Sequence, residues 1–486
     1  MLYKMEITKK TIVFNFFWKF AESCGAQVIS FVVSIILARI LLPDDYGVVA
    51  ICMIFMNLLM PLVDSGFGVA LIQKKVVDDV DFSSVFWINI VFSLCMYIVI
   101  WILAPYIAHF YDIEILEKLI RVMGINVIVM GVRNIQQAYA SRCMVFKKFF
   151  WATFIGALLS AVVGIAMAYL GYGVWAIVAQ GIVNNIVGTI VLWYTVAWKP
   201  RLLFSFQRVK KLFGYGSKIL ISGIVDSFYN QLSQILIGKV YTTSDLAFYN
   251  RGNSLPSLLV NNINNSLNSV LLPAMSNYQD DREKMRNMTR RALKVSSYVM
   301  APLMMGMAFA SDNIIEVLLT HKWMECVPYL CIFCINYMFW PIHTVNLNAI
   351  KSMGRSDIFL KLELVKKLVG FSVLIFTFKI GVLAMAIGIL VTGIVSQIVN
   401  AWPNKKLLNY GYVDQLKDVF PSFTMAFFMG IIIYLLNYLY LDVFVTLCLQ
   451  IFVGLVSYIF MSYIFEVDVF EYCFLLVKDR YKLMYK

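Results

Sequence analysis

The stretch INIVFSLCMYIVIWILA, residues 88–104, decides the fold class of this chain. It carries no charged residue and nearly reaches the 20 or so apolar residues that cross a bilayer core as a helix. Comparable runs occupy residues 31–38 and 155–170. Of the 486 residues, 61% are hydrophobic and 14% are charged, whereas soluble chains carry about 25% charged residues. This composition excludes a soluble globular protein and predicts an integral membrane protein.

Apolar segments of spanning length continue along the whole chain, separated by polar or Gly/Pro-containing connections. They predict an all-α membrane protein with about fourteen transmembrane helices. The expected helices lie near residues 12–39, 45–63, 83–104, 116–138, 149–170, 174–197, 209–238, 245–273, 292–310, 326–350, 357–378, 381–401, 418–438 and 442–464.

The basic residues of the connections predict the orientation. Lys and Arg are concentrated in the two tails and in every second connection, as in Lys199-Pro-Arg201 and Lys405-Lys406, and are sparse in the others. Because cytoplasmic loops carry the excess of Lys and Arg, both termini are expected in the cytoplasm. The net charge of +13 is therefore a topology signal, and no nucleic-acid partner is expected.

A weak internal repeat predicts two lobes. The pattern begins with a small residue next to a basic one and continues with an acidic and then a small residue. It occurs twice, about 200 residues apart, each time at the junction of two apolar segments. The matched positions are Ala38, Arg39, Asp45 and Gly47, and then Gly238, Lys239, Asp245 and Ala247. Parallel repeats of this kind are related by an axis along the membrane normal. We expect lobes of six helices at 1–200 and 201–403, with two additional helices and a tail at 404–486.

Polar residues form stripes on several apolar segments. In segment 209–238 they recur every fourth residue and so share one helical face. Segments 12–39, 116–138 and 245–273 have related patterns. The stripes comprise Asn15, Lys19, Glu22, Gln27, Ser30 and Ser34; Asn126, Arg133 and Gln137; Lys218, Ser222, Asp226, Asn230 and Gln234; and Asn250, Ser254, Ser257, Asn261, Asn264 and Asn268, with Arg251 at the edge of the last.

The ionisable members of these stripes indicate a solvated cavity. Each would cost about 2.5–3.5 kcal/mol at the bilayer centre if it faced lipid. Internal ion pairs and helix–helix hydrogen bonds are the alternative, and Lys19 with Glu22 suits it. Stripes that run along matching helices favour the cavity. Its six ionisable residues leave a surplus of two positive charges, which suits an anionic ligand; they are Lys19, Glu22, Arg133, Lys218, Asp226 and Arg251.

Motifs for catalysis or cofactor binding are not found in the sequence. It contains no GxxxxGK[ST] or HExxH motif. The three histidines, His109, His321 and His343, are scattered, and the Cys331/Cys334 pair has no second ligand pair at metal-site spacing. The chain is therefore expected to be neither an enzyme nor a metalloprotein, and to use no cofactor.

Several segments resemble the bacterial polysaccharide flippases of the multidrug/oligosaccharidyl-lipid/polysaccharide exporter superfamily, of the O-antigen and colanic-acid unit type. The similar segments are SFVVSIILARILLPDDYGVVAI at 30–51, DSGFGVALIQKK at 64–75, DLAFYNRGNSLPSLL at 245–259 and VLLPAMSNYQDD at 270–281. The resemblance implies two six-helix bundles forming a V around a cationic cavity. It also implies an undecaprenyl-pyrophosphate-linked oligosaccharide as cargo, moved from the cytoplasmic to the outer leaflet.

Combined with the stripes, the resemblance suggests a role for each candidate residue. Lys19, Arg133, Lys218 and Arg251 would hold the pyrophosphate, Asn261 and Asn264 would meet sugar, and Glu22 and Asp226 would form ion pairs or couple transport to an ion. Candidate partners are membrane lipid, H+ or Na+ as the coupling ion, and a polysaccharide polymerase. The alternatives are a drug/cation antiporter of the same superfamily and a membrane-embedded polysaccharide polymerase or acyltransferase.

Overall fold

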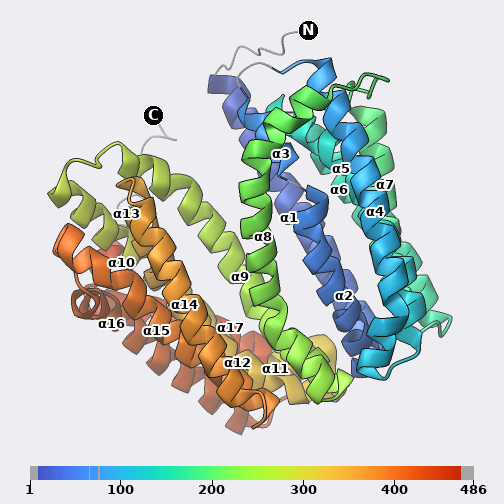
Figure 1. The fold of residues 1–486 in the computed structure, drawn as a ribbon. Coiled ribbons are helices and arrows are strands. Elements are labelled where there is room, and N and C mark those ends of the chain that lie inside the picture. Colours follow the sequence, from blue (N-terminus) through green and yellow to red (C-terminus); the bar gives the residue numbers. More distant parts are fainter. Residues whose placement is uncertain (1–8, 65, 75–76, 144, 472–486) are drawn as a thin grey trace. The chain divides into compact units, whose positions relative to one another are not determined.

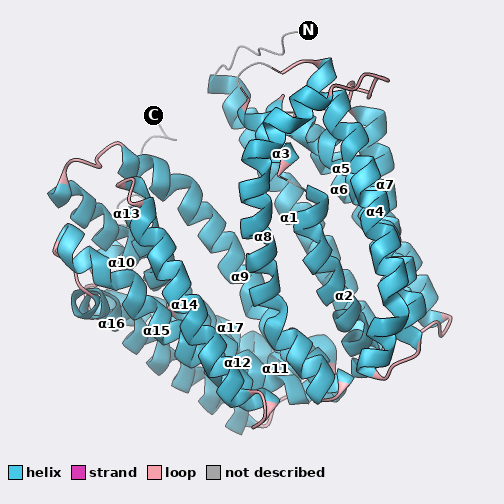
Figure 2. Ribbon diagram, in the orientation of Figure 1, coloured by secondary structure: helices cyan, strands magenta, loops and turns pink. Residues whose placement is uncertain are grey.

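A computed structural model describes residues 9–64, 66–74, 77–143 and 145–471. It leaves out some side chains within the helices, including those of Lys19, Glu22 and Lys218. Within the described ranges the chain forms helices and short connections and no strand, as Figure 2 shows. The fold is therefore all-α, as the sequence predicts. The chain divides into two compact units, residues 1–247 and 248–486.

The first unit is built from eight helices and the start of a ninth (Figure 1). Within it α6 packs against α1 and α7, α5 packs against α4, α7 and α2, and α8 packs against α2, α3 and α4. The helices are α1 Lys9–Ile40, α2 Pro43–Asp64, α3 Phe67–Gln73, α4 Asp79–Tyr111, α5 Ile115–Arg142, α6 Phe146–Tyr169, α7 Val174–Thr195 and α8 Phe206–Val240.

The second unit contains most of α9 and the remaining helices. In this unit α10 packs against α12 and α16, α15 against α14 and α12, and α16 against α17. The elements are α9 Thr243–Ser276, α10 Arg282–Phe309, α11 Ser311–Leu319, α12 Val327–Met338, α13 Trp340–Ser352, α14 Ser356–Thr377, α15 Val382–Leu408, α16 Tyr412–Leu435 and α17 Val443–Ile464, with short 3-10 helices at His321–Cys326 and Leu436–Leu439.

Every segment expected to span the membrane falls on a long helix or, for 326–350, on the consecutive helices α12 and α13. Among the described residues, nine helical segments are long and apolar enough to cross a bilayer. The chain is therefore a multi-pass membrane protein. The long helices α5, α8, α9 and α14 fall short and are rich in polar and charged residues, whereas the described side chains of α1 include the apolar stretch Gln27–Ile40, which is shorter than a full span. The full count of about fourteen spans and the lobe boundaries at 200 and 403 remain predictions.

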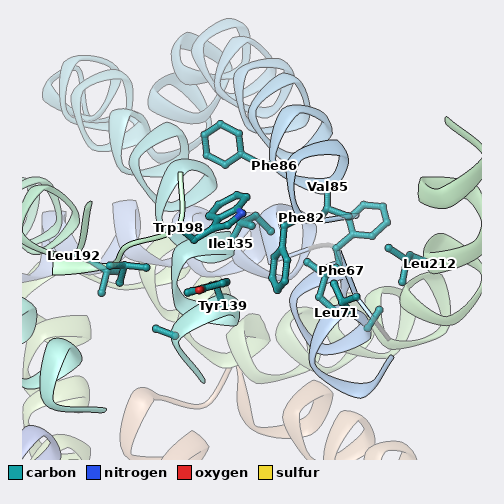
Figure 3. Packing of buried hydrophobic residues seen from close by; sticks show 14 of the residues in the cluster. Phe67, Leu71, Phe82, Val85, Phe86, Ile135, Tyr139, Leu192, Trp198 and Leu212 are labelled. Carbon is teal, nitrogen blue, oxygen red and sulfur yellow. The ribbon is translucent and has the colours of Figure 1, made fainter. Parts of the chain in front are cut away.

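Aromatic side chains hold together one end of the first unit. Phe82 of α4 lies 5.5 Å, between ring centroids, from both Tyr139 of α5 and Trp198 of the α7–α8 linker. Figure 3 shows these rings together with Leu71 of α3 and Leu212 of α8. Buried aromatic residues remove large apolar areas from solvent. The cluster therefore fixes the linker to the ends of four helices.

The start of α4 is stabilised by a capping box. The Asp78 carboxylate accepts a hydrogen bond from the Asp81 backbone N–H at 3.0 Å, and the Asp81 carboxylate accepts one from the Asp78 N–H at 3.3 Å. Asp81 is buried, and it forms ion pairs with Lys74 and Arg208. Reciprocal caps of this kind satisfy backbone donors at a helix start that have no partner within the helix. The ion pairs connect the starts of α4 and α8.

Polar side chains attach the last two long helices to the second unit. Asn313 of α11 donates to Asn437, at 2.7 Å, and to Gln450 of α17, at 3.0 Å. Arg290 of α10 forms a two-point ion pair with Asp418 of α16, with both nitrogen–oxygen distances at 2.7 Å. In a membrane, apolar side chains gain little by leaving lipid for a neighbouring helix. Hydrogen bonds between helices therefore add to the close packing that holds the helices together.

Candidate functional site

A cavity of about 100 Å³ lies inside the first unit, between α1, α5, α6 and α7. It is large enough for roughly three water molecules. Arg133 lines the cavity, and its guanidinium Nη1 lies 3.5 Å from the point where a Cβ on Gly188 would be. The residues that line it are Ser30, Arg133, Ala152, Thr153, Ala157, Asn184 and Gly188.

Small residues let α6 and α7 approach each other closely beside this cavity. On α6, a Cβ at Gly156 would lie 2.9 Å from the backbone oxygen and the side-chain oxygen of Asn184 on α7, so only glycine permits this approach. Close approach through small residues is a recurrent way in which membrane helices pack. The cavity is polar at Arg133, Ser30 and Asn184 and apolar at its alanines, and its described lining contains no acidic residue.

The polar stripe of α8 is largely exposed. Ser222, Asp226 and Asn230 are exposed, while Gln234 is half-buried. The side chain of Lys218, the fifth member of the stripe, lies outside the described residues. Side chains that only join helices would be covered by a neighbouring helix, so the exposure of this stripe suits a solvated face.

The polar face of α9 is divided between two environments. Asn264 is buried and accepts a hydrogen bond from Thr344 of α13 at 2.9 Å. Asn268 likewise accepts from Asn348 of α13 at 2.6 Å, and Asn253 accepts from Tyr337 of α12 at 2.8 Å. These amides join α9 to its neighbours.

The two asparagines expected to meet sugar therefore differ. Asn264 has a protein partner, whereas Asn261, three residues earlier on the same helix, is exposed. Their role in sugar binding stays a prediction.

Arg251 lies near the start of α9, beside the buried ring of Trp323. Its guanidinium carbon is 5.5 Å from the centre of that ring, and Trp323 is buried completely. A guanidinium over an indole face is stabilised by a cation–π interaction. The arrangement explains how the helix accommodates this arginine, and the role of Arg251 in pyrophosphate binding stays a prediction.

The structure brings together only some of the candidate residues. Arg133 and Ser30 line one cavity of the first unit, Asp226 lies on the exposed face of α8, and Arg251 and Asn264 belong to the second unit. The side chains of Lys19, Glu22 and Lys218 lie outside the described residues.

Two groups of polar residues lie outside the candidate site residues predicted from the sequence, although Asn336, His343 and Asn346 are polar positions within the apolar segment 326–350. Thr153 and Asn184 line the cavity beside Arg133, and the consecutive asparagines at 184–185 within an apolar segment were the available signal. In the second unit, Asn346 of α13 exchanges hydrogen bonds of 2.7 and 2.9 Å with Gln415 of α16 and accepts one of 2.6 Å from Asn404 of α15. This buried network spans three helices far apart in sequence, so no local pattern indicates it.

Comparison with known proteins identifies the family. Residues 36–328 match the family model described as "Polysaccharide biosynthesis protein", which is more than half of the chain. The chain belongs to this family of polysaccharide biosynthesis proteins. The resemblance to polysaccharide flippases drawn from the sequence is thereby confirmed. Among the described residues, no group of His, Cys, Asp and Glu could hold a metal ion.

Named relatives come from several bacteria. The succinoglycan biosynthesis transport protein ExoT of Rhizobium meliloti (strain 1021) is 26% identical over 67% of this chain and 66% of its own length. The teichuronic acid biosynthesis protein TuaB of Bacillus subtilis (strain 168) is 26% identical over 61% of this chain and 62% of its own. The lipopolysaccharide biosynthesis protein WzxC of Escherichia coli (strain K12) is 21% identical over 75% and 74%. The chain thus spans slightly less than two thirds of the first two relatives.

Solved structures share the fold. The lipid II flippase MurJ in an inward closed conformation superposes with a TM-score of 0.76 over 93% of this chain and 99% of its own, at 15% identity. An inward-facing multidrug resistance transporter of the MATE family gives 0.59 over 80% and 98%, at 12% identity. The names of these neighbours describe a flippase and a transporter rather than enzymes.

Proposed function

We propose that this protein translocates an undecaprenyl-pyrophosphate-linked oligosaccharide from the cytoplasmic to the outer leaflet of the bacterial inner membrane, for cell-surface polysaccharide biosynthesis. It works by alternating access, while the polyprenyl tail of the cargo stays in lipid. The proposal rests on membership of the polysaccharide biosynthesis family, and on relatives whose names include a succinoglycan transport protein and a lipopolysaccharide biosynthesis protein.

The single observation that carries the proposal is the exposed polar face of α8, with Ser222, Asp226 and Asn230. An aspartate and an asparagine exposed on an apolar helix favour water or a polar ligand against that face, because a charged side chain is costly to place in lipid. A hydroxyl-rich, charged head group is such a ligand.

We assign roles as follows within this proposal. Lys19, Arg133, Lys218 and Arg251 bind the pyrophosphate through charge-assisted hydrogen bonds, and Asn261 and Asn264 bind sugar. Glu22 and Asp226 form ion pairs with the basic residues or exchange a coupling ion, H+ or Na+. A polysaccharide polymerase consumes the delivered cargo.

The test is flipping of a fluorescent undecaprenyl-pyrophosphate oligosaccharide in proteoliposomes that contain the purified full-length protein. We expect the wild-type protein to flip it and the variant Lys19→Ala/Arg133→Ala/Lys218→Ala/Arg251→Ala to lose flipping at normal protein levels. Arg133→Lys, which keeps the charge in the cavity, should lose less than Arg133→Gln. A matched control is Lys379→Gln, at the exposed α14–α15 turn. Wild-type flipping by the quadruple variant would refute the assignment of residues.

The same vesicles separate the rival functions. A drug/cation antiporter would accumulate a fluorescent organic cation under an imposed H+ or Na+ gradient and would ignore the glycolipid. A polymerase or acyltransferase would change the mass of the glycolipid, which flipping does not. We expect neither accumulation of the cation nor a change of mass.

The topology is proposed with the function. About fourteen spans would leave both termini in the cytoplasm, with lobes at 1–200 and 201–403 and two additional helices at 404–486. Reporter fusions after residues 204, 280 and 354 should all read as cytoplasmic, and fusions after 112 and 380 as external. External readings at the first three positions together with cytoplasmic readings at the last two would contradict the proposed orientation.

A further inference from the structure

The linker between α7 and α8, residues 196–205, carries large apolar side chains that the fold leaves uncovered. Leu202 is 90% exposed, Phe204 is 56% exposed, and Phe206 at the start of α8 is 66% exposed. Leu203 is partly exposed beside them. Single exposed apolar residues are ordinary, but a group on one short segment marks an interaction surface.

The backbone of this linker is held firmly in place. Trp198 is buried in the aromatic cluster of Figure 3, and its carbonyl accepts a hydrogen bond from Gln136 at 3.0 Å. The carbonyl of Arg201 accepts one from Trp87 Nε1 at 2.9 Å.

Two serines of α4 complete the attachment. Ser83 Oγ accepts from the Arg201 N–H at 3.0 Å, and Ser84 Oγ accepts from the Ser205 N–H at 2.9 Å. The apolar side chains of Leu202 and Phe204 therefore point outward from a linker whose backbone is fixed on both sides of them.

The position of the linker limits what can cover it. It follows the last residue of α7, a spanning segment that ends at Thr195, and it crosses the first turns of α4, a spanning segment that starts at Asp79. Both apolar segments therefore have an end at this level. The linker consequently lies at the boundary between hydrocarbon and water, where amphipathic segments insert their apolar side chains below the head groups.

Basic side chains surround the apolar ones. The stretch 199–210 contains Lys199, Arg201, Arg208 and Lys210 and no acidic residue. Arg201 and Arg208 pair with the aspartates at the start of α4. Lys199 and Lys210 are exposed, and neither forms an ion pair with any carboxylate that the structure describes.

The aromatic side chains nearby match the same environment. Lys199 Nζ lies 5.1 Å from the ring centre of Trp193, and Tyr194 is exposed at the end of α7. Trp and Tyr concentrate where a membrane protein meets the head groups.

We propose that the α7–α8 linker is a binding site for anionic phospholipid head groups. Leu202, Phe204 and Phe206 insert into the interfacial layer, and Lys199 and Lys210 hold the lipid phosphates. The partner is an anionic lipid surface, because apolar side chains flanked by exposed lysines at a bilayer boundary complement negative head groups above acyl chains. This inference is independent of the transported cargo.

The experiment measures lipid retention by the purified full-length protein in native mass spectrometry, with phosphatidylglycerol and phosphatidylcholine added in equal amounts. We expect wild-type protein to retain phosphatidylglycerol preferentially. Lys199→Gln/Lys210→Gln should lower that preference by roughly fivefold for each lysine. Leu202→Ser/Phe204→Ser/Phe206→Ser, which changes only exposed side chains, should lower retention of both lipids at this site.

The matched control is Lys379→Gln/Ile380→Ser, which removes one exposed lysine and one exposed apolar side chain at the α14–α15 turn. It should leave the preference unchanged, and all variants should keep the wild-type thermal midpoint in detergent. Raising the salt from about 0.1 to about 0.5 M should weaken the wild-type preference, since exposed charges are screened. An equal preference in wild type and the double lysine variant would overturn the proposal, as would an equal loss in the control.

Discussion

Gly47 of α2 is a position where no other residue fits. A Cβ at this position would overlap the backbone carbonyl group of Thr243, at the start of α9. Both residues belong to the first unit. The lack of a side chain therefore permits the α1–α2 turn to lie directly against the α8–α9 turn.

Gly47→Ala should lower the free energy of unfolding by about 1–3 kcal/mol, because overpacking must be relieved by moving backbone. Gly181 of α7 provides the matched control, since no described heavy atom lies within 4 Å of the point where its Cβ would be. Gly181→Ala should be neutral or stabilise the helix by about 0.5–1 kcal/mol. Thermal unfolding of the purified variants in detergent measures both, and equal midpoints for the two would contradict the argument.

Asp78 makes the attachment of α8 to α4 dependent on pH. Desolvation acts to raise the pKa of its carboxyl, but hydrogen bonds from Arg208 and from the Asp81 N–H outweigh it and hold the pKa below its usual range. A lowered pKa in the folded state stabilises the protein above the unfolded value of about 3.9. That contribution is lost as the pH falls through the folded pKa.

The expected result is that Asp78→Asn lowers the thermal midpoint at pH 7 and that its difference from wild type shrinks below about pH 4. The measurement is thermal unfolding in detergent between about pH 3 and 7. Asp281→Asn provides a comparison, because Asp281 caps α10 without an arginine partner among the described residues. If the difference in thermal midpoint between Asp78→Asn and wild type stayed constant with pH, this role of the Asp78 carboxyl would be excluded.

At the scale of elements, the two repeated turns share a hydrogen bond from a backbone N–H to an aspartate three residues later, and the second turn adds bonds through the Thr242 hydroxyl. In the first, the Leu42 N–H donates to the Asp45 carboxylate at 3.2 Å, and in the second the Thr242 N–H donates to Asp245 at 3.1 Å. The turns also contact each other, since Ser244 donates to Asp44 at 3.1 Å. The repeat read from the sequence thus corresponds to a shared helix-start geometry.

Asp45→Ala and Asp245→Ala should therefore have similar effects, each lowering stability by about 0.5–2 kcal/mol through loss of an N-terminal cap. Asp44→Ala should have a different effect on stability. The Asp44 carboxylate accepts a hydrogen bond from Ser244 in the other turn, and Ser244, which occupies the equivalent position there, has no carboxylate. Chemical unfolding of the three variants in mild detergent tests this. The two turns would not be equivalent if the losses of stability in Asp45→Ala and Asp245→Ala differed from each other more than either differs from the loss in Asp44→Ala.

At the scale of the whole molecule, the helices depend on one another to different degrees. The helix α17 has no charged residue, whereas α9 contains Arg251, Asp245 and three asparagines whose partners lie on α12 and α13. We expect α17 to insert into a microsomal membrane as an isolated segment and α9 to fail, with a difference of several kcal/mol in apparent insertion free energy.

Replacing four of the amides by leucine should let isolated α9 insert; these are Asn261, Asn264, Asn265 and Asn268. A glycosylation-site assay on single segments provides the measurement. Efficient insertion of unmodified α9 would show that its polar residues need no neighbouring helix.

Much of the fold could be predicted from the sequence, because hydropathy is a local property. The expected segments coincide with helices, and the family resemblance rested on contiguous motifs such as 30–51. Hydropathy alone reaches its limit at α5, α8 and α9, where the polar residues of the stripes lower the apolar signal, and at α14, which carries several charged residues.

The candidate site depended much more on tertiary structure. Asn261 and Asn264 belong to one stripe, yet one is exposed and the other bonds to Thr344, eighty positions along the chain. The sequence by itself determined an all-helical membrane protein of the polysaccharide biosynthesis family, since periodicity, apolar length and contiguous motifs are local. Only the tertiary structure decided which polar side chains have protein partners, because a hydrogen bond depends on the helix packed opposite, which no local pattern encodes.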